Sequence, residues 1–460
     1  MLENFKIFDS LRAKKVRFEP HDQNNVKFYA CGPTVYNYAH IGNARMAVVC
    51  DLLRNILNLL FKKVTFVSNV TDIDDKIIDF AIKENLTTKE VSEKFLKIYN
   101  QDMKALGVSL PDIQPKATDH VNEIIDTIKN LIEKKKAYVA NKHVLFFVPS
   151  YEFYGALSKR SLDELNAGSR IEVESFKKHN SDFVLWKPSK VNEPAWDSPW
   201  GKGRPGWHIE CSVMSEKTLG IPFDIHGGGA DLKFPHHENE IAQSCSLGDK
   251  SQKPEQFSKY WFHNGFVLVN GEKMSKSLGN VVLVNDLIKD FSGEVIRFAL
   301  LSAHYRKPLN WTPKVLDQAK KNLQKFYKFL ELTKNIEITE DEETKYSQNM
   351  TLCILDDLNI PGALGILNST LKKYSVKDKS TQIAVKANLN TLGKVLGLFK
   401  NNKNNTKNTV NDKLIIKLVE ERNQARLNKD FKKADEIRQK LIDLDIKIED
   451  KIGETTWQKK

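Results

Sequence analysis

A strand, a helix and a second strand follow one another near the N-terminus, and this succession restricts the fold more than any other feature of the chain. Apolar residues at 26–31 predict a short buried strand, which Gly32, Pro33 and Thr34 interrupt. Apolar residues at helical spacing predict a long helix from about residue 42 to residue 61, and residues 63–70 predict the next strand. A crossover helix between two strands implies a parallel sheet of the dinucleotide-binding type, and therefore an α/β fold.

The tetrapeptide His40-Ile41-Gly42-Asn43 stands where this helix is expected to begin. Helix N-termini attract phosphate through free backbone N–H groups, and Gly42 would let a ligand approach the backbone closely. A histidine before a helix is more often a cap or a surface residue. From the residues alone, both interpretations of His40 stay open.

A second candidate phosphate contact is the pentapeptide Lys273-Met274-Ser275-Lys276-Ser277, which lies between Gly271 and Gly279. Two cations among small, flexible neighbours predict a mobile loop that closes over a triphosphate and places its lysines on the oxygens where charge develops. The alternative is a solvated basic turn.

A metal site is the third candidate. His236 and Glu240 are four residues apart, so on a helix they project from one face, which suits two metal ligands. Cys31 and Cys211, expected at turns where sheet strands end, could converge on them to complete a tetrahedral zinc shell. Taken singly, each cysteine is more often a small core residue, and the spacing leaves His236, His237, Glu238 and Glu240 as alternative ligands.

Several longer motifs narrow the interpretation. With these motifs and the histidine and lysine motifs above, the chain resembles class I aminoacyl-tRNA synthetases. Within that class it is similar to the cysteinyl-tRNA synthetase family over nearly its whole length. The motifs that carry this resemblance are Tyr29-Ala30-Cys31-Gly32-Pro33-Thr34-Val35-Tyr36, Gly206-Trp207-His208-Ile209-Glu210-Cys211-Ser212, His226-Gly227-Gly228-Gly229-Ala230-Asp231-Leu232 and Phe234-Pro235-His236-His237-Glu238-Asn239-Glu240.

The resemblance implies an ATP-dependent ligase that forms cysteinyl-adenylate and transfers cysteine to the 3′ end of tRNA(Cys), with Mg²⁺ accompanying the ATP. It implies catalytic roles for His40, Lys273 and Lys276, with Lys276 favoured for contact with the transition state. The implied sites are ATP binding by His40, Gly42, Asn43, Gly227, Gly228, Gly229 and Lys276, cysteine binding by Thr71, Trp207 and Asp231, and one zinc ion held by Cys31, Cys211, His236 and Glu240.

Three of these roles have structural alternatives. Trp207 could be core packing, and residues 71–75 could simply cap the following helix. Gly227, Gly228 and Gly229, three consecutive glycines expected after a strand, allow close approach by adenosine, with a flexible turn as the alternative. Asn43 stands where many class I enzymes carry a second histidine. Its amide can donate a hydrogen bond but cannot act as an acid.

A metal would answer the central specificity problem of an enzyme that uses cysteine. Serine differs from cysteine only by oxygen in place of sulfur, and an apolar pocket separates such near-isosteres only about a hundredfold. Zinc binds a soft thiolate far better than a neutral hydroxyl. The hypothesis is therefore direct binding of the substrate sulfur to zinc, either as a fifth ligand or after Glu240 loosens.

Composition fits an RNA-binding enzyme. The chain has 71 Lys and Arg against 59 Asp and Glu, a net charge of +12, which suits a nucleic-acid partner. Its five cysteines have no paired spacing and argue against a disulfide framework. No apolar run suggests a signal peptide or a membrane span, so a cytoplasmic protein with no membrane partner is expected, and a monomer is favoured.

The motifs also predict the domain organisation. Residues 297–306 are expected to form a helix that faces tRNA, the alternative being a structural helix with two solvated arginines. The polar residues 401–411 are expected to be a linker, and Arg438 and Trp457 are candidates for contacts with anticodon bases. The predicted parts are a Rossmann-type catalytic domain (1–112 and 206–312, the latter with the lysine loop and stem contacts), a connective insertion (113–205), a tRNA-binding helical bundle (313–400), the linker (401–411) and a small anticodon-binding domain (412–460).

Two rival functions follow from the same motifs. One is a ligase that activates cysteine in the same way but gives it to a small amine; the helical C-terminal half argues against it, because such relatives lack an anticodon-binding end. The other is a non-catalytic paralogue that only binds RNA. The intact lysine loop and the complete set of candidate metal ligands argue against this second alternative.

Overall fold

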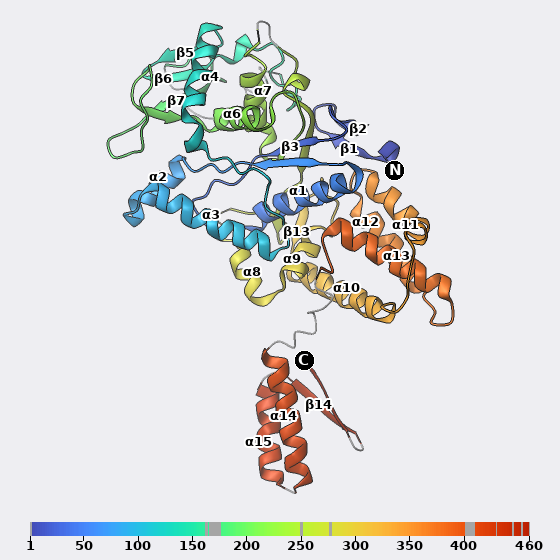
Figure 1. Cartoon of the computed structure of the whole chain (residues 1–460). Helices are drawn as coiled ribbons and strands as arrows, with labels where there is room; N and C mark the ends of the chain where they lie inside the picture. The colour runs from blue at the N-terminus through green and yellow to red at the C-terminus, as the bar shows by residue number, and fades with distance from the viewer. Residues whose placement is uncertain are drawn as a thin grey trace. The chain divides into compact units, whose positions relative to one another are not determined.

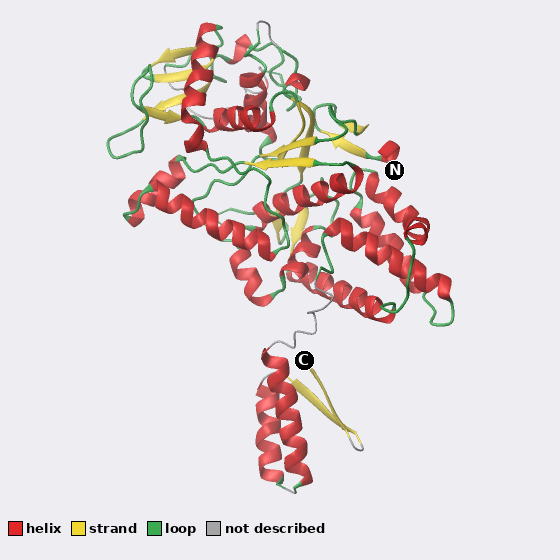
Figure 2. Ribbon diagram, viewed as in Figure 1, coloured by secondary structure: helices red, strands yellow, loops and turns green. Residues whose placement is uncertain are grey.

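The computed structural model describes residues 2–161, 164, 176–248, 252–275, 278–400, 410–428, 430–443, 446–451 and 454–459. These residues fall within two compact units, Met1–Leu398 and Phe399–Lys460. Figure 1 follows the chain through both units, and Figure 2 distinguishes their helices from their strands. No helix among the described residues is both long enough and apolar enough to cross a membrane.

A four-stranded parallel sheet lies at the centre of the first unit. Its strand order is β10-β9-β3-β4, with Phe28 of β3 beside Phe66 of β4 on one edge and Ile225 of β9 on the other. The helix α1 (Ile41–Leu60) joins β3 to β4, so the predicted strand–helix–strand unit and the α/β fold are confirmed. The four strands are β3 (Val26–Ala30), β4 (Val64–Ser68), β9 (Phe223–Gly229) and β10 (Ser258–Asn264).

Helices cover both faces of this sheet. Figure 1 shows α1 on one side and α6 (Trp207–Leu219) on the other. Buried side chains of α6, including Ile209 and Val213, belong to one apolar core with Tyr29 and Val67 of the sheet. A sheet that is buried on both faces explains why its strands are nearly continuous apolar runs in the sequence.

Two charged residues interrupt the apolar face of α1. Arg45 is completely buried and has no acidic partner among the described residues; its guanidinium donates hydrogen bonds to the carbonyl oxygens of Gly265, Phe266, His304 and Lys307, at 2.7–3.2 Å. One side chain therefore fixes the end of β10 to a loop some forty residues further along the chain.

The second charged residue of α1, Asp51, connects the catalytic sheet to the helical region. It forms a buried ion pair with Arg297 and accepts a hydrogen bond from the backbone N–H of Ser109. Arg297 also donates from Nε to the carbonyl oxygen of Leu396, at 2.5 Å. Four segments far apart in the sequence thus meet at one salt bridge.

An insertion separates β4 from β9. Its own sheet is antiparallel, in the order β5-β6-β7-β8, and packs with α4 and α6 around Trp186 and Phe146. Its elements are α2 (Asp75–Glu84), α3 (Thr88–Ala105), η2 (Ala117–His120), α4 (Val121–Glu133), β5 (Ala137–Ala140), β6 (His143–Phe146), η3 (Val148–Ser150), β7 (Phe183–Pro188) and β8 (Gly203–Pro205).

Beyond β10 the chain forms a small sheet and then helices. The sheet has the order β12-β11-β13 and carries Lys273 at its edge. A helical bundle follows, as the apolar spacing of residues 313–400 predicts. These elements are β11 (Val267–Val269), β12 (Glu272–Lys273), α8 (Val284–Asp290), α9 (Gly293–Leu300), β13 (Leu309–Trp311), α10 (Pro313–Leu332), α11 (Glu340–Leu355), α12 (Ile360–Lys372) and α13 (Lys379–Leu396).

The remaining elements of the first unit are short. They are η1 (Leu2–Asn4), the antiparallel pair β1 (Lys6–Asp9) and β2 (Lys14–Arg17), η4 (Lys233–His237), α7 (Glu238–Ser244) and η5 (Pro254–Gln256). Of these, η4 and α7 matter most for function, because they follow β9 directly.

The second unit is a helical hairpin with a β-hairpin. Val419, Ile437, Leu441 and Ile446 form its small apolar core. The first two residues of α14 belong to the predicted linker, whose other residues, 401–409, lie outside the described part of the chain. The elements are α14 (Val410–Leu427), α15 (Phe431–Asp443), β14 (Ile446–Lys451) and β15 (Glu454–Lys459).

The prediction of an exposed helix over residues 297–306 is wrong. The helix α9 ends at Leu300, and Arg297 is 1% exposed, bound to Asp51 rather than to solvent or RNA. Arg306 lies beyond the helix and binds the buried carboxylate of Asp357 from Nε, at 2.8 Å. The sequence showed two arginines but not the distant carboxylates that neutralise them.

The buried ion pair of α1 gives a stability prediction. Replacement Arg297→Met should lower the free energy of unfolding of the first unit by about 3–5 kcal/mol, because Asp51 would stay buried without a counter-charge. Urea unfolding followed by tryptophan fluorescence measures the change. The control is Lys289→Met, which breaks an exposed pair with Asp286 and should cost no more than about 1 kcal/mol. Equal stability of the two variants would contradict the role given to Arg297.

Candidate active site

Thiol, imidazole and carboxylate groups converge at the carboxyl end of the central strands. Cys31 follows the last residue of β3, and Cys211 lies in the second turn of α6. His236 comes from η4 and Glu240 from the first turn of α7, which continues η4 directly. All four are buried, with at most 3% exposure. The structure thus brings together the four residues that the family resemblance implied as metal ligands.

The distances within this cluster suit a tetrahedral metal. The Sγ atoms of Cys31 and Cys211 are 3.8 Å apart, and Cys31 Sγ lies 3.5 Å from Oε1 of Glu240. Tetrahedral zinc with bonds of about 2.3 Å to sulfur and about 2.1 Å to oxygen would separate these pairs by about 3.8 and 3.6 Å. His236 Nε2 is 3.0 Å from the same Oε1. The buried Cys, His and Glu group can therefore hold a metal ion.

A second group of ligands overlaps the first. Cys31 and Glu240 also lie close to His226 and His237, with Cys31 Sγ 3.3 Å from His237 Nε2. His226 Nε2 lies 2.8 Å from Oε2 of Glu240, the oxygen that faces away from His236. Glu240 is therefore shared between the two groups: Oε1 lies toward His236 and His237, and Oε2 lies toward His226.

Further histidines surround these ligands. His208 Nδ1 lies 2.8 Å from His236 Nδ1, and His237 Nδ1 lies 2.8 Å from His263 Nε2. His263 in turn contacts Ser10 Oγ through Nδ1, at 2.8 Å. Such contacts hold the rings so that their other nitrogens face the ligand cluster, which is the usual function of groups behind metal ligands.

Burial and mutual attraction shift the pKa values of the cluster in opposite directions. Burial would lower the pKa of His236, but the Glu240 carboxylate and the Cys211 thiolate outweigh it and raise this pKa to about 10. A hydrogen bond from Cys31 outweighs burial and lowers the pKa of Cys211 to about 6. Burial raises the pKa of Cys31. Without metal, one proton on His236 thus balances part of the negative charge.

Burial keeps His208 and His263 neutral. Burial, followed by the charge of His236, lowers the pKa of His208 to about 3, and burial, followed by the charge of Lys233, lowers that of His263 to about 3. Because His208 is neutral, it accepts a hydrogen bond from the protonated Nδ1 of His236.

Two expectations about local structure are wrong. Cys211 does not lie at a turn where a strand ends; it is a buried residue in the second turn of α6. The glycines at 227–229 do not follow the strand but form its last three residues, in β9. At Gly228 a methyl group would lie 2.7 Å from Cε1 of His237, so a packing requirement fixes this glycine.

The histidine motif forms the N-terminus of α1. His40 is the cap: its Nδ1 accepts hydrogen bonds from the backbone N–H groups of Gly42 and Asn43, while Asn43 Oδ1 accepts one from the His40 N–H. The cap interpretation of His40 is therefore correct. Since Nδ1 accepts, the proton of the neutral ring is on Nε2, which can donate to another group. Burial lowers the pKa of His40 and keeps the ring neutral.

The lysine loop returns to this helix terminus. Beyond the loop, Ile41 N–H donates to the carbonyl oxygen of Val282, at 3.0 Å, and Val284 N–H donates to that of Ala39, at 2.9 Å. Within the loop, the methyl carbon of Met274 lies 3.2 Å from the position of an added Cβ on Gly42. The two motifs, over two hundred residues apart in sequence, are thus in contact.

The loop lysines are described only in part. Lys273 is exposed on β12, with its ammonium 5.8 Å from the centre of the Phe266 ring. Lys276 lies outside the described residues.

The three residues that the resemblance implied for cysteine binding differ in exposure. The Trp207 ring is stacked on His236, 4.2 Å between centres, and is 40% exposed. Asp231 is exposed beside Gly229, near enough to His40 to oppose the fall in the His40 pKa. Thr71 is buried and donates its hydroxyl to Glu210 Oε2, at 3.2 Å.

Sequence reasoning missed His208, His226 and His263 as parts of the site. The first two stand inside motifs that were identified, so their position was a signal, but their spacing predicts no ligand pair. His263 lies in β10, the neighbour of β9 in the sheet, and only strand pairing reveals that it is close to His237.

Comparison with protein families gives one match. Residues 17–321 match the model of the tRNA synthetases class I (C) catalytic domain. This match covers more than half of the chain, including Cys31, Cys211, His236 and Glu240 and the histidine motif at the start of α1.

Curated relatives match over the full chain. The cysteine–tRNA ligase of Ehrlichia canis is 47% identical over 464 residues, covering 99% of this chain and 100% of the relative. That of Parvibaculum lavamentivorans is 45% identical over 460 residues, covering 98% and 97%. Among solved structures, Mycobacterium tuberculosis methionyl-tRNA synthetase with methionyl-adenylate has a TM-score of 0.59 at 13% identity, covering 82% of this chain and 92% of that one, which shows a shared fold.

The contact between β9 and the histidine cluster gives a prediction. Gly228→Ala should destabilise the protein by about 1–3 kcal/mol, because the buried His237 ring cannot move away from the new methyl group. Thermal unfolding measures the effect. Gly365→Ala in α12 is the control: its methyl group would enter open space, and alanine in a helix should stabilise by about 0.5–1 kcal/mol. A Gly228→Ala protein as stable as this control would show that His237 is not fixed.

Proposed function

The chain belongs to the cysteine–tRNA ligases of the class I tRNA synthetases, and on this basis we propose that Cys31, Cys211, His236 and Glu240 bind the zinc ion that selects its substrate. The enzyme activates L-cysteine with ATP and transfers it to tRNA(Cys). The observation that carries the proposal is the buried four-residue cluster with its 3.8 Å separation of two thiol groups. The match over 97–100% of the relatives, C-terminal region included, favours tRNA as acceptor over a small amine and catalysis over a purely RNA-binding role.

We favour this ligand set over the one with His226 and His237. It contains two sulfur donors, which zinc prefers, and the lowered pKa of Cys211 supplies a thiolate. His226 would then orient Glu240 by contacting Oε2, the carboxylate oxygen that the metal does not use. When bound, zinc would accept the substrate thiolate far more readily than the hydroxyl of serine and would lower the pKa of the thiol.

The residues beside the cluster would shape the cysteine pocket. Trp207 lies against His236 and reaches solvent, so it is placed to close one side of the pocket. Asp231 offers a carboxylate for the substrate ammonium group. We propose that Thr71 supports this side of the pocket through Glu210, because its hydroxyl already donates a hydrogen bond to Glu210.

Phosphate groups would be bound where the helix terminus and the lysine loop meet. Among the described residues, nothing accepts a hydrogen bond from His40 Nε2–H or from the side-chain amide of Asn43, so both can donate to phosphate, and the positive end of α1 adds to their attraction. The nucleotide would lie against the backbone of Gly42 and of residues 227–229, and Lys273 and Lys276 would close over its phosphates. Mg²⁺ would be held mainly by the phosphate oxygens.

Little acid–base chemistry is then required of the chain. The cysteine carboxylate attacks the α-phosphorus, the bond from that phosphorus to the bridging oxygen breaks, and pyrophosphate leaves. The terminal adenosine of tRNA next attacks the acyl carbon, and AMP leaves. The chain positions the reactants and stabilises charge on the phosphoryl group, which is the main requirement of such transfers.

The C-terminal regions would bind the rest of the tRNA. We propose that the bundle at residues 313–400 contacts the tRNA body and that residues 412–460 read the anticodon. Arg438 on α15 is one candidate contact, and the side chain of Trp457 lies outside the described part of the structure.

Metal dependence is the first test of the zinc site. Cysteine-dependent exchange of pyrophosphate into ATP should occur with the zinc-loaded enzyme, disappear after chelation and return with added zinc, with serine inactive throughout. Cys211→Ala should lose both zinc, measured by elemental analysis, and exchange; even an outer-shell change typically costs about 10–100-fold in metal affinity. Cys245→Ala, a buried cysteine outside the cluster, should keep both. Exchange by a folded, metal-free Cys211→Ala protein would refute the proposal.

The two properties of His40 can be separated by substitution. His40→Asn keeps an N-cap acceptor but removes the ring N–H, so stability should be retained while exchange falls about 10²–10³-fold, the scale for one lost donor to a developing charge. His40→Ala should lose the same activity and also about 1 kcal/mol of stability. Stopped-flow adenylate formation and thermal unfolding are the measurements. Full activity in His40→Asn would leave His40 with a capping role alone.

A further inference from the structure

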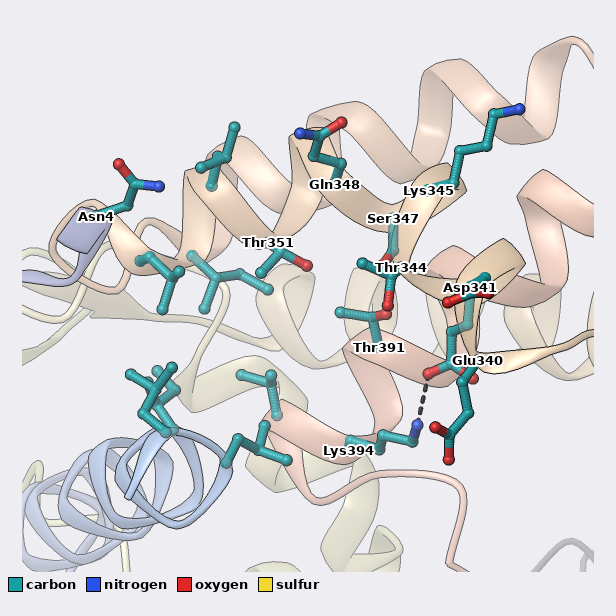
Figure 3. Close-up of a pocket in the computed structure, with 18 residues that line it drawn as sticks. Asn4, Glu340, Asp341, Thr344, Lys345, Ser347, Gln348, Thr351, Thr391 and Lys394 are labelled. Atoms are coloured by element: carbon teal, nitrogen blue, oxygen red, sulfur yellow. Dashed lines mark hydrogen bonds and ion pairs between the residues drawn. The ribbon is translucent and has the colours of Figure 1, made fainter. Parts of the chain in front are cut away.

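Buried polar atoms without a regular hydrogen bond mark the places where a fold leaves a contact to be made. Among the described residues, no such atom lines the cavity of about 660 Å³ between α11, α13 and the end of α1, which Figure 3 shows. Its acidic residues Glu340 and Asp341 belong to the first turn of α11, where a helix N-terminus favours them. In the central sheet, by contrast, the side chain of Tyr29 is 0% exposed, and its hydroxyl forms no regular hydrogen bond with any described residue.

Tyr29 lies on the same face of the sheet as the ligand cluster. It is paired in register with His226 of β9, and the centres of the two rings are 5.2 Å apart. His226 in turn contacts Glu240, at 2.8 Å. Side chains two positions apart on a strand point to the same face, so Tyr29 and Cys31 lie side by side along β3. Tyr29, Cys31 and Cys211 belong to one buried core.

The electrostatics place the Tyr29 hydroxyl next to the sulfur of Cys211. Burial, followed by the charges of Cys211, Cys31 and Glu240, raises the pKa of Tyr29 well above its ordinary value. Cys211 contributes most among these charged groups, and it also acts as a nearby hydrogen-bond acceptor. The hydroxyl therefore keeps its proton and is a donor that faces a sulfur atom.

The ligand cluster needs such a donor when a metal is bound. Cys31, Cys211 and Glu240 bring one more negative charge than zinc neutralises, and the substrate thiolate adds another, all without water. His226 faces the second oxygen of Glu240, and His237 Nε2 lies 3.3 Å from Cys31 Sγ. Cys211 Sγ contacts Cys31 and His236, but both are themselves ligands and cannot donate to it once they bind the metal.

We propose that the Tyr29 hydroxyl donates a hydrogen bond to the metal-bound sulfur of Cys211 and is a positioning residue of the zinc site. This inference rests on the zinc site proposed above. The hydrogen bond fixes the direction of the Cys211 side chain and draws electron density from its sulfur. Both effects strengthen the site and make it easier for the metal to accept a further, negatively charged thiolate.

Cobalt in place of zinc reports directly on the sulfur. The cobalt-loaded full-length protein should show a thiolate-to-cobalt charge-transfer band. In Tyr29→Phe this band should move to longer wavelength, because a sulfur that has lost a hydrogen bond gives up an electron more readily. The zinc affinity of the same variant, measured by competition with a chromophoric chelator, should fall about tenfold. Thermal unfolding of the metal-free Tyr29→Phe protein should show no loss of stability, because the variant removes only a buried hydroxyl without a regular partner.

Tyr151→Phe is the matched control. Tyr151 is 1% exposed and lies in the same core, but its hydroxyl donates to the carbonyl oxygen of Gln252, at 3.0 Å. This variant should lose stability while its cobalt band and zinc affinity stay those of the wild type.

The outcomes separate this inference from the zinc site itself. A wild-type protein without a thiolate-to-cobalt band would refute the zinc site, and the role of Tyr29 with it. A normal wild-type band that stays in place in Tyr29→Phe, with zinc affinity unchanged, would overturn the role of Tyr29 alone. An unchanged band together with a raised KM for cysteine would assign the hydroxyl to the substrate and equally overturn its contact with Cys211.

Discussion

The carboxylate of Glu240 is completely buried, and the structure around the active site depends on how its charge is satisfied. A carboxylate without water is very unfavourable unless cations and donors surround it. His226 from β9 meets one oxygen, while His236 from η4 and Cys31 from the end of β3 meet the other. The carboxyl ends of two parallel strands and the helix that follows them are therefore held together at one point. The same arrangement gives a metal ion its oxygen, nitrogen and sulfur donors.

The helix α1 connects the active-site region to the helical bundle. At its N-terminus, His40 both closes the helix and keeps an N–H free, so the side chain that stabilises the helix is also the one that faces the proposed phosphate site. Further along the helix, Arg45 donates hydrogen bonds to backbone carbonyl oxygens, and Asp51 forms an ion pair with Arg297. The bundle is thus attached to the helix that begins at the active site, and damage to the ion pair would disturb both regions.

Contact between the two signature motifs has a mechanical consequence. The segment after the lysine loop is hydrogen-bonded to the backbone on either side of His40, while Met274 rests on Gly42. At the nucleotide site proposed above, a nucleotide that approaches Gly42 would meet this methionine, and we propose that ATP binding and movement of the loop are linked through the contact.

The sequence by itself determined the α/β class, a crossover helix at about residues 42–61 and the helical character of residues 313–400, because periodic apolar residues are a local signal. It also supplied the four candidate metal ligands through family motifs. Only the tertiary structure decided which groups meet. It placed Cys211 inside a helix, seated Gly228 against His237, added His208, His226 and His263 behind the ligands, and buried Arg297 against Asp51. Each of these depends on the pairing of segments that are distant in the chain, and residue spacing carries no information about which distant charge or ring will lie opposite.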